Sequence, residues 1–296
     1  MVRLRKTFPL LILIAAPFVL YQYFFYFARK PLNNALLEQV KKNDLAQVES
    51  LLVRGADINS RDSTKFRSCT DANPPRTRYT PLILSTFRHS RDSRVKRNTA
   101  MMDLLLKHGA NPNLGDTHSK TPLHFAASQG DVAAVQALLS HGADANVKDY
   151  VGDTPLIAAA YGNNIKVVKL LLAHGADVNI KGQSDFSALA RATGYCDNLE
   201  VMKLLIAHGA EVNTRDRFGA TPLHDAASYG RTEAIQTLLQ HGADPKAKDD
   251  KGRTPLTMVV SYGTKALDES QDSQRSKVMQ RQALMTKLLT DNSTDN

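Results

Sequence analysis

The chain has 296 residues, of which 42% are hydrophobic and 23% are charged, and these proportions exclude a wholly disordered chain. Tryptophan is absent and aromatic residues make up 6%, so the core must be mainly aliphatic, which suits packed helices. The two cysteines, Cys69 and Cys196, are too few for a disulfide framework or a structural zinc site.

The formal net charge of +9 is unevenly distributed. Residues 1–30 carry five basic side chains and no acidic one, and residues 61–97 carry ten basic and three acidic side chains. Since these regions contribute +5 and +7, the remainder carries −3. The charge therefore does not describe a uniformly basic domain, and the chain has no recognisable nucleic-acid-binding module, so nucleic acid is not an expected partner.

The first predicted element is a membrane-spanning helix within residues 1–30. Residues 8–28 form an uncharged run that is long enough, at ~1.5 Å per residue, to cross a bilayer core of roughly 30 Å. Aromatic side chains dominate its far end, residues 21–27, as is typical of a membrane interface. The alternatives are a cleaved signal peptide, although Ala28 is the only small residue near its end, and a soluble helix.

The basic residues that flank this run are almost evenly divided between its two sides. A short charged N-terminal tail usually stays inside the cell, so we expect a single-pass anchor whose C-terminal body is exported. In a bacterium that body would lie in the periplasm, anchored to the inner membrane. If the segment is cleaved instead, the body would be secreted to the periplasm.

Beyond the anchor, two sequence markers recur with one period. Thr-Pro begins at residues 80, 121, 154, 221 and 254, with Ser187-Ala188 in the matching place. Leu-Leu-x-x-Gly-Ala, or a close variant, places glycine at residues 55, 109, 142, 175, 209 and 242. From residue 109 onward the glycines are 33 or 34 residues apart. Two independent markers thus indicate one structural repeat.

The chemistry inside each repeat predicts two helices. Threonine caps a helix and proline suits its first position, where its missing N–H costs nothing. A second apolar pattern, as in Val135, Leu138 and Leu139, predicts another helix, and glycine ends it. Aspartate and a further glycine then predict a tight turn that projects between repeats.

The motif Thr-Pro-Leu-His at 121–124 and 221–224, with His-Gly-Ala-Asp-x-Asn at 141–146 and 174–179, resembles ankyrin repeats. The resemblance implies an all-α ankyrin-repeat solenoid over residues 31–296, made of helix-turn-helix units joined by hairpin fingers, each contacting only its neighbours. We expect about seven units. Their approximate bounds are 33–60, 79–113, 120–147, 153–180, 186–214, 220–247 and 253–292.

Three of these units depart from the pattern. The second is expanded by insertions on both sides of Thr80. The fifth has Ser187-Ala188 in place of Thr-Pro, so we expect its first helix to be less firmly capped. The last carries an insertion near residues 264–275 and ends in Asn292. It is expected to be the C-terminal cap, as the first unit is the N-terminal cap.

The sequence shows no catalytic constellation. Seven of the nine histidines recur at the repeat period, and the remaining two, His89 and His118, have no ligating residues at metal-binding spacing. No phosphate-binding loop, serine elbow or zinc-binding helix is present. We therefore expect no enzyme activity, no cofactor or metal, and no small-molecule substrate.

Aromatic side chains mark the predicted binding face. The resemblance implies a concave groove lined by finger tips and by the outer surface of each first helix. The aromatic residues that fall at such positions are Tyr79, Tyr150, Tyr161, Tyr195, Phe218, Tyr229 and Tyr262, and all of these except Tyr79 are the candidate partner-binding residues. Such rings are enriched at binding hot spots; the alternative is that they pack against adjacent repeats.

A basic cluster accompanies the insertions of the second unit. Its candidate binding residues are Arg76, Arg78, Arg88, Arg91, Arg94, Lys96 and Arg97. They could contact anionic lipid headgroups, steer an acidic protein partner, or form a solvated loop.

The leading hypothesis for function is a membrane-tethered, non-catalytic scaffold for protein–protein interaction. The alternative is an immunity-type or chaperone-like inhibitor that caps a specific enzyme. An enzyme with an unrecognised site is the least favoured.

Overall fold

The computed structural model describes residues 29–61, 78–87, 99–194, 198–260 and 272–294, and these ranges contain helices and turns but no strand. The chain divides into two compact units, Met1–Thr117 and His118–Asn296. Within the described ranges no helix is both long and apolar enough to cross a membrane. The predicted span at residues 8–28 lies outside them.

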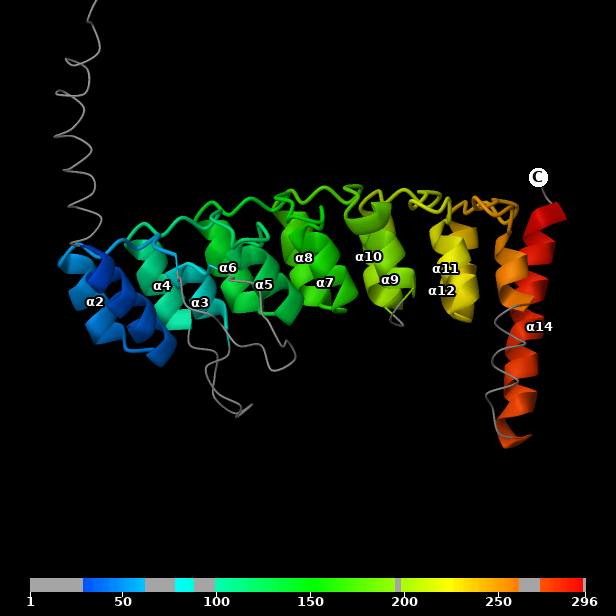
Figure 1. Ribbon diagram of the computed structural model, residues 1–296. Coiled ribbons are helices and arrows are strands. Elements are labelled where there is room, and N and C mark those ends of the chain that lie inside the picture. Colours follow the sequence, from blue (N-terminus) through cyan, green and yellow to red (C-terminus); the bar gives the residue numbers. More distant parts are fainter. Residues whose placement is uncertain (1–28, 62–77, 88–98, 195–197, 261–271, 295–296) are drawn as a thin grey trace, which may run out of the picture. The chain divides into compact units, whose positions relative to one another are not determined.

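The first unit contains four described helices (Figure 1). These are a helix at 29–42, α2 (Leu45–Val53), α3 (Pro81–Thr86) and α4 (Thr99–Lys107). Helix α4 contacts both α2 and α3. Its buried methionines and leucines therefore join the apolar faces of two successive helix pairs into one core.

The second unit is a row of helix pairs, as the labelled helices of Figure 1 show. The pairs are α5 (Pro122–Gln129) with α6 (Val132–Ser140), α7 (Pro155–Tyr161) with α8 (Ile165–Ala173), α9 (Ala188–Gly194) with α10 (Leu199–Ala207), and α11 (Pro222–Ser228) with α12 (Thr232–Gln240). A short 3₁₀ turn, η1 (Gln183–Asp185), precedes α9. Successive first helices contact one another, and so do successive second helices.

The end of the second unit differs from the other pairs. A helix at 255–260 is followed by α14 (Asp272–Thr294), which has 23 residues where the second helices from α6 to α12 have nine. Residues 272–275, expected in an insertion, are therefore helical. Met285 and Leu289 lie one turn apart on α14 and are fully buried, and α14 contacts α12. This long helix closes the apolar edge of the preceding pair.

Each first helix begins as its sequence predicts. The hydroxyls of Thr80 and Thr154 accept the backbone N–H three residues on, at 3.2 and 3.3 Å. Ser187 makes the same bond to Ala190 N–H at 3.2 Å. The expectation of a less firmly capped helix in the fifth unit is therefore wrong, because serine supplies the same acceptor as threonine.

The histidines of Thr-Pro-Leu-His extend these caps. Because a backbone N–H can only donate, His124 Nδ1 accepts from Thr121 N–H at 3.2 Å, which leaves Nε2–H to donate to the Asp153 carbonyl at 3.0 Å. His224 repeats both bonds with Thr221 and Arg253. Burial lowers the pKa of both imidazoles, although the hydrogen bond to the carbonyl opposes the shift. Both ring nitrogens thus serve the fold.

A second set of polar bonds joins each repeat to the next through one asparagine. Asn179 donates to the Gly209 carbonyl at 3.0 Å and accepts from Glu211 N–H at 2.9 Å. Asn146 bridges to Gly175 and Asp177 in the same way, and Asn213 bridges to Gly242 and Asp244. These asparagines bind the turn where the next repeat's second helix has just ended.

We predict that Asn179→Ala lowers the free energy of unfolding by about 1–2 kcal/mol, since it removes two hydrogen bonds between repeats. Urea unfolding followed by far-UV circular dichroism measures the change. Gln240→Ala, an exposed helix position, is the control and is expected to stay within about 0.5 kcal/mol of the wild type. Equal stability of both variants would show that the asparagine bridges contribute little.

Candidate functional site

The finger tips are shaped by one aspartate each. Asp216 Oδ1 accepts the backbone N–H groups of Phe218 and Ala220, at 2.8 and 2.9 Å. Asp149 and Asp249 hold their own turns by the same pattern. Each closed turn runs from the aspartate to the residue four positions on, and these turns include Tyr150 and Phe218.

Neighbouring finger tips are tied together through the backbone. Tyr150 N–H donates to the His118 carbonyl at 2.8 Å, Arg217 N–H to Ser184 at 3.1 Å, and Asp250 N–H to Phe218 at 3.0 Å. The remaining link is a side-chain bond, in which Asp153 Oδ1 accepts Gln183 N–H at 2.8 Å. The tips therefore form a continuous row whose side chains are free to differ from repeat to repeat. A row with fixed backbone and variable side chains suits recognition of an extended partner surface.

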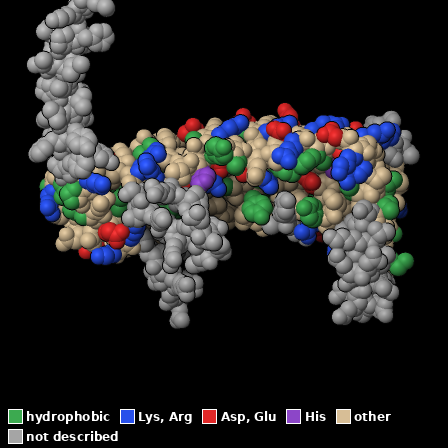
Figure 2. Space-filling view, in the orientation of Figure 1, with side chains coloured by type: hydrophobic (Ala, Val, Ile, Leu, Met, Phe, Trp, Pro, Cys, Tyr) green, Lys and Arg blue, Asp and Glu red, His purple; other side chains and the backbone are tan. Residues whose placement is uncertain are grey.

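Two aromatic residues stand on these tips, as predicted. Tyr150 is 79% exposed and Phe218 is 53% exposed. The Arg217 guanidinium lies 4.7 Å from the centre of the Phe218 ring, a cation–π contact that holds the ring in place. Figure 2 shows the surface from α5 to α12, where charged side chains of both signs follow one edge and hydrophobic side chains form separate patches over the helices.

Two tyrosines lie where the first helices end, again as predicted. Tyr161 is the last residue of α7 and is 51% exposed. Tyr229 caps α11 and is 42% exposed. The Tyr229 ring also covers the preceding repeat, because a Cβ on buried Gly194 would lie 3.4 Å from its Cε2 atom. Both predictions therefore hold for Tyr229, because part of its ring packs against the adjacent repeat and the rest is exposed for binding.

Between the tips and the helix ends runs a column of half-buried side chains, one from each first helix. Its members are Phe125, Ala158, Arg191, Asp225 and Met258. The Arg191 guanidinium stacks 4.6 Å from the centre of the Phe186 ring. The column therefore changes from apolar to charged at α9 and α11 and gives this face a specific charge pattern.

Asp225 is the titratable group of the column. Burial raises its pKa to about 7, and the nearby Asp216 carboxylate adds to the shift while Arg191 opposes it. Near neutral pH this carboxyl is therefore divided between a neutral donor form and a charged acceptor form.

The other candidate residues are placed as follows. Arg78 is exposed in the first unit. The remaining candidates lie outside the described residues: Tyr195, Tyr262, Arg76, Arg88, Arg91, Arg94, Lys96 and Arg97. Across the described ranges no group of three histidine, cysteine, aspartate or glutamate side chains is arranged to hold a metal.

Comparison with known protein families decides the family. A family described as ankyrin repeats (3 copies) matches residues 36–149, 92–182, 146–216 and 189–268. Together these matches run from residue 36 to residue 268, well over half of the chain. The chain belongs to the ankyrin repeat family. The predicted family is thereby confirmed, and no curated protein matches the sequence.

The charged part of the column in this ankyrin repeat protein was not predicted from its sequence. Arg191 and Asp225 occupy the position four residues after the capping Ser187 and Thr221, where other repeats carry Phe125, Ala158 and Met258. Aligning the repeats by their caps and looking for opposite charges at one position would have found the pair.

We predict that Asp225→Asn raises the free energy of unfolding at pH 8 by about 1–3 kcal/mol, because it removes a charge that burial disfavours. A raised pKa means that the fold favours the protonated carboxyl. The stability that the protonated Asp225 carboxyl contributes to the fold is therefore fully present below the ordinary pKa of 3.8, and it is lost as the pH rises through about 7. The gain over the wild type should shrink towards pH 5 in urea unfolding.

Glu233→Gln, at an exposed position of α12, is the matched control and should change stability little at either pH. If Asp225→Asn instead lowered the free energy of unfolding at pH 8, the charged carboxylate would stabilise the folded state, contrary to this prediction.

Proposed function

We propose that this protein is a membrane-tethered, non-catalytic scaffold. It binds a protein partner across the finger tips and the first-helix ends of residues 118–296. The observation that carries the proposal is the exposure of four of the five described aromatic residues at the predicted positions, Tyr79 being the exception. Tyr150, Tyr161, Phe218 and Tyr229 are all exposed, whereas the described Tyr79, Phe87, Phe125 and Phe186 are half-buried.

The physical reason is that a tyrosine or phenylalanine ring offers large contact area with little rotamer freedom to lose. A single exposed ring needs no explanation. Here the exposed rings occupy only the two kinds of position that vary between ankyrin repeats, the finger tip and the end of the first helix. The bonded row of tips holds the backbone beneath them, so a partner would meet a preorganised surface.

A non-catalytic role is supported by how the reactive side chains are used. His124 and His224 have both ring nitrogens hydrogen-bonded within the fold. His141, His174, His208 and His241 each donate Nδ1–H to a carbonyl four residues earlier. These side chains cap helices and join repeats, which leaves binding as the property of the exposed face.

The scaffold proposal predicts that Tyr150→Ser combined with Phe218→Ser reduces capture of the partner at least about tenfold, as expected for two hot-spot residues. The full chain is cross-linked in native membranes and the yield of the captured partner is quantified. Both rings are exposed, so the unfolding transition should move by less than about 0.5 kcal/mol.

Val53→Ser combined with Leu284→Ser is the matched control. Both residues are exposed and apolar, but they lie on α2 and α14. The control should capture the partner as the wild type does. If both double variants captured the partner equally well, Tyr150 and Phe218 would not contribute to partner binding.

The tether is proposed from the uncharged run at residues 8–28 and the basic residues on both of its sides. We propose that the C-terminal body is exported, which places it in the periplasm of a bacterium. A reporter that is active only outside the cytoplasm, fused after Asn296, should therefore be active. A fusion that lacks residues 1–30 is the control and should be inactive; activity of a cytoplasm-only reporter on the intact chain would reverse the proposed topology.

A further inference from the structure

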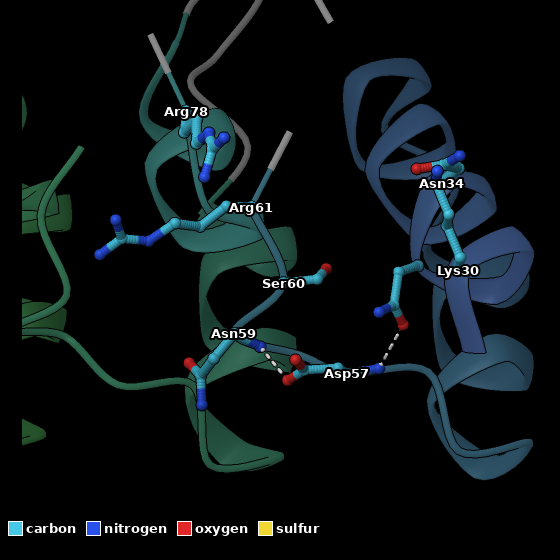
Figure 3. A pocket seen from close by; sticks show the side chains of 8 residues that line it. Lys30, Asn34, Asp57, Asn59, Ser60, Arg61 and Arg78 are labelled. Atoms are coloured by element: carbon cyan, nitrogen blue, oxygen red, sulfur yellow. Dashed lines mark hydrogen bonds between the residues drawn. The ribbon is translucent and has the colours of Figure 1, made fainter. Parts of the chain in front are cut away.

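The first unit contains a polar cavity of about 340 Å³ between the helix at 29–42 and the finger that follows α2. Figure 3 shows its walls, with Lys30 and Asn34 on one side, Arg61 and Arg78 on the other, and Ser60 between them. Its volume falls at the lower end of the range typical of small-ligand sites, roughly 300–1,000 Å³. The lining residues of the cavity belong to the first unit, whereas the proposed partner face belongs to the second unit.

The lining of this cavity is electropositive. Lys30, Arg61 and Arg78 are three cations, and Asp57 is the one carboxylate among the lining residues, so the formal net charge is +2. Among the residues that the structure describes, none of the three cations forms a hydrogen bond or an ion pair. Asp57 is instead engaged by the finger, since its Oδ1 accepts Asn59 N–H at 2.9 Å.

Ser60 gives an independent sign of a ligand. Its residue is only 8% exposed, and its buried hydroxyl oxygen has no hydrogen-bond partner within the described structure. In Figure 3 this hydroxyl points into the space between the arginine side and the Lys30 side. A buried hydroxyl normally finds a partner, so its orientation into a cationic cavity indicates that a bound group supplies one.

The walls of the cavity are held in place without a ligand. Asn33 Oδ1 accepts Asp57 N–H at 2.8 Å and joins the helix at 29–42 to the finger. Asn59 Oδ1 accepts Asn111 N–H at 2.9 Å and joins the finger to the turn after α4. These bonds correspond to the accepting half of the asparagine bridges in the second unit, so the site is preorganised.

We infer that this cavity binds a phosphate group carried on an organic molecule. The unengaged lining groups are hydrogen-bond donors from three cations and one hydroxyl, which matches an anion with several acceptor oxygens. A phosphate presents more oxygens than a carboxylate and pairs well with arginine. The cavity has room for the group that carries the phosphate, which is either a phospholipid headgroup or a soluble phosphate ester.

Lys30 follows almost directly on the uncharged run that ends at Ala28. The headgroup source therefore rests on the proposed tether, which would keep this cavity close to the membrane surface. The binding site itself does not, because its lining residues belong to the folded first unit.

The test uses the full chain in phosphatidylcholine nanodiscs, with thermal unfolding followed by far-UV circular dichroism. Inorganic phosphate should raise the Tm in a saturable way, whereas chloride at equal ionic strength should not. Arg61→Gln combined with Arg78→Gln should weaken phosphate binding at least about tenfold. Arg54→Gln combined with Lys107→Gln removes the same charge from exposed positions outside the cavity and should leave binding unchanged.

Ser60→Ala separates a ligand-binding role from a structural one. It should weaken phosphate binding while leaving the Tm without phosphate unchanged or higher, because it removes a hydroxyl that lacks a partner. Loss of Tm without phosphate, with unchanged phosphate binding, would assign Ser60 to the fold and overturn its part in the site.

Adding phosphatidic acid to the nanodiscs distinguishes the two sources. If the headgroup fills the cavity, the Tm is raised before phosphate is added and the response to phosphate disappears. If the response persists, the ligand is a soluble phosphate, and the site stands although a headgroup does not fill it. The inference is overturned if phosphate gives no saturable shift, or if the Arg61 and Arg78 double variant responds as strongly as the wild type.

Discussion

The fold depends on one constraint: a single pair of short helices cannot bury its apolar face without a neighbouring pair. The repeat period satisfies this constraint by returning the same leucine to the same place. In the first helices these fully buried leucines are Leu123, Leu156, Leu189 and Leu223, and in the second helices they are Leu138, Leu171, Leu205 and Leu238. Each leucine belongs to a core shared between adjacent repeats, so no repeat of the row is stable by itself.

Polar bonds give this apolar row its register. The threonine and histidine caps fix where each first helix begins, and the asparagine bridges fix where the next repeat's turn must lie. The bridges stop where the architecture changes. Lys246 occupies the place of the bridging asparagine in the last Gly-Ala-Asp turn, and the repeat that follows ends in the long helix α14 instead of another such turn. The series of asparagine bridges therefore ends in the sequence at the point where the regular repeats end in the structure.

The features that sequence predicted correctly are those set by local chemistry. A proline after threonine gave the start of α7, and counting along the repeat placed Tyr161 at its end. The features missed arise between repeats. The Tyr229 ring over Gly194 brings together residues 35 positions apart, and Arg191 and Asp225 interact electrostatically from neighbouring first helices. Arg78 was predicted as a binding residue, but the cavity that it lines with Ser60 and Arg61 was not, because these residues come from both sides of an insertion that the other repeats lack. The length of α14 was missed because residues 264–275 were interpreted as an insertion.

Within each repeat, the positions that stabilise the fold are different from the positions proposed to bind a partner. Buried leucines, caps and bridges hold the repeats together, while the tips and first-helix ends carry the exposed aromatic side chains. The most direct test places a photo-cross-linking amino acid at Tyr161, on the proposed binding face, or at Lys169, an exposed position of α8, in the full chain in native membranes. The account predicts a defined cross-linked partner from position 161 and none from position 169. Cross-linking from position 169 alone, or equal cross-linking from both, would contradict it.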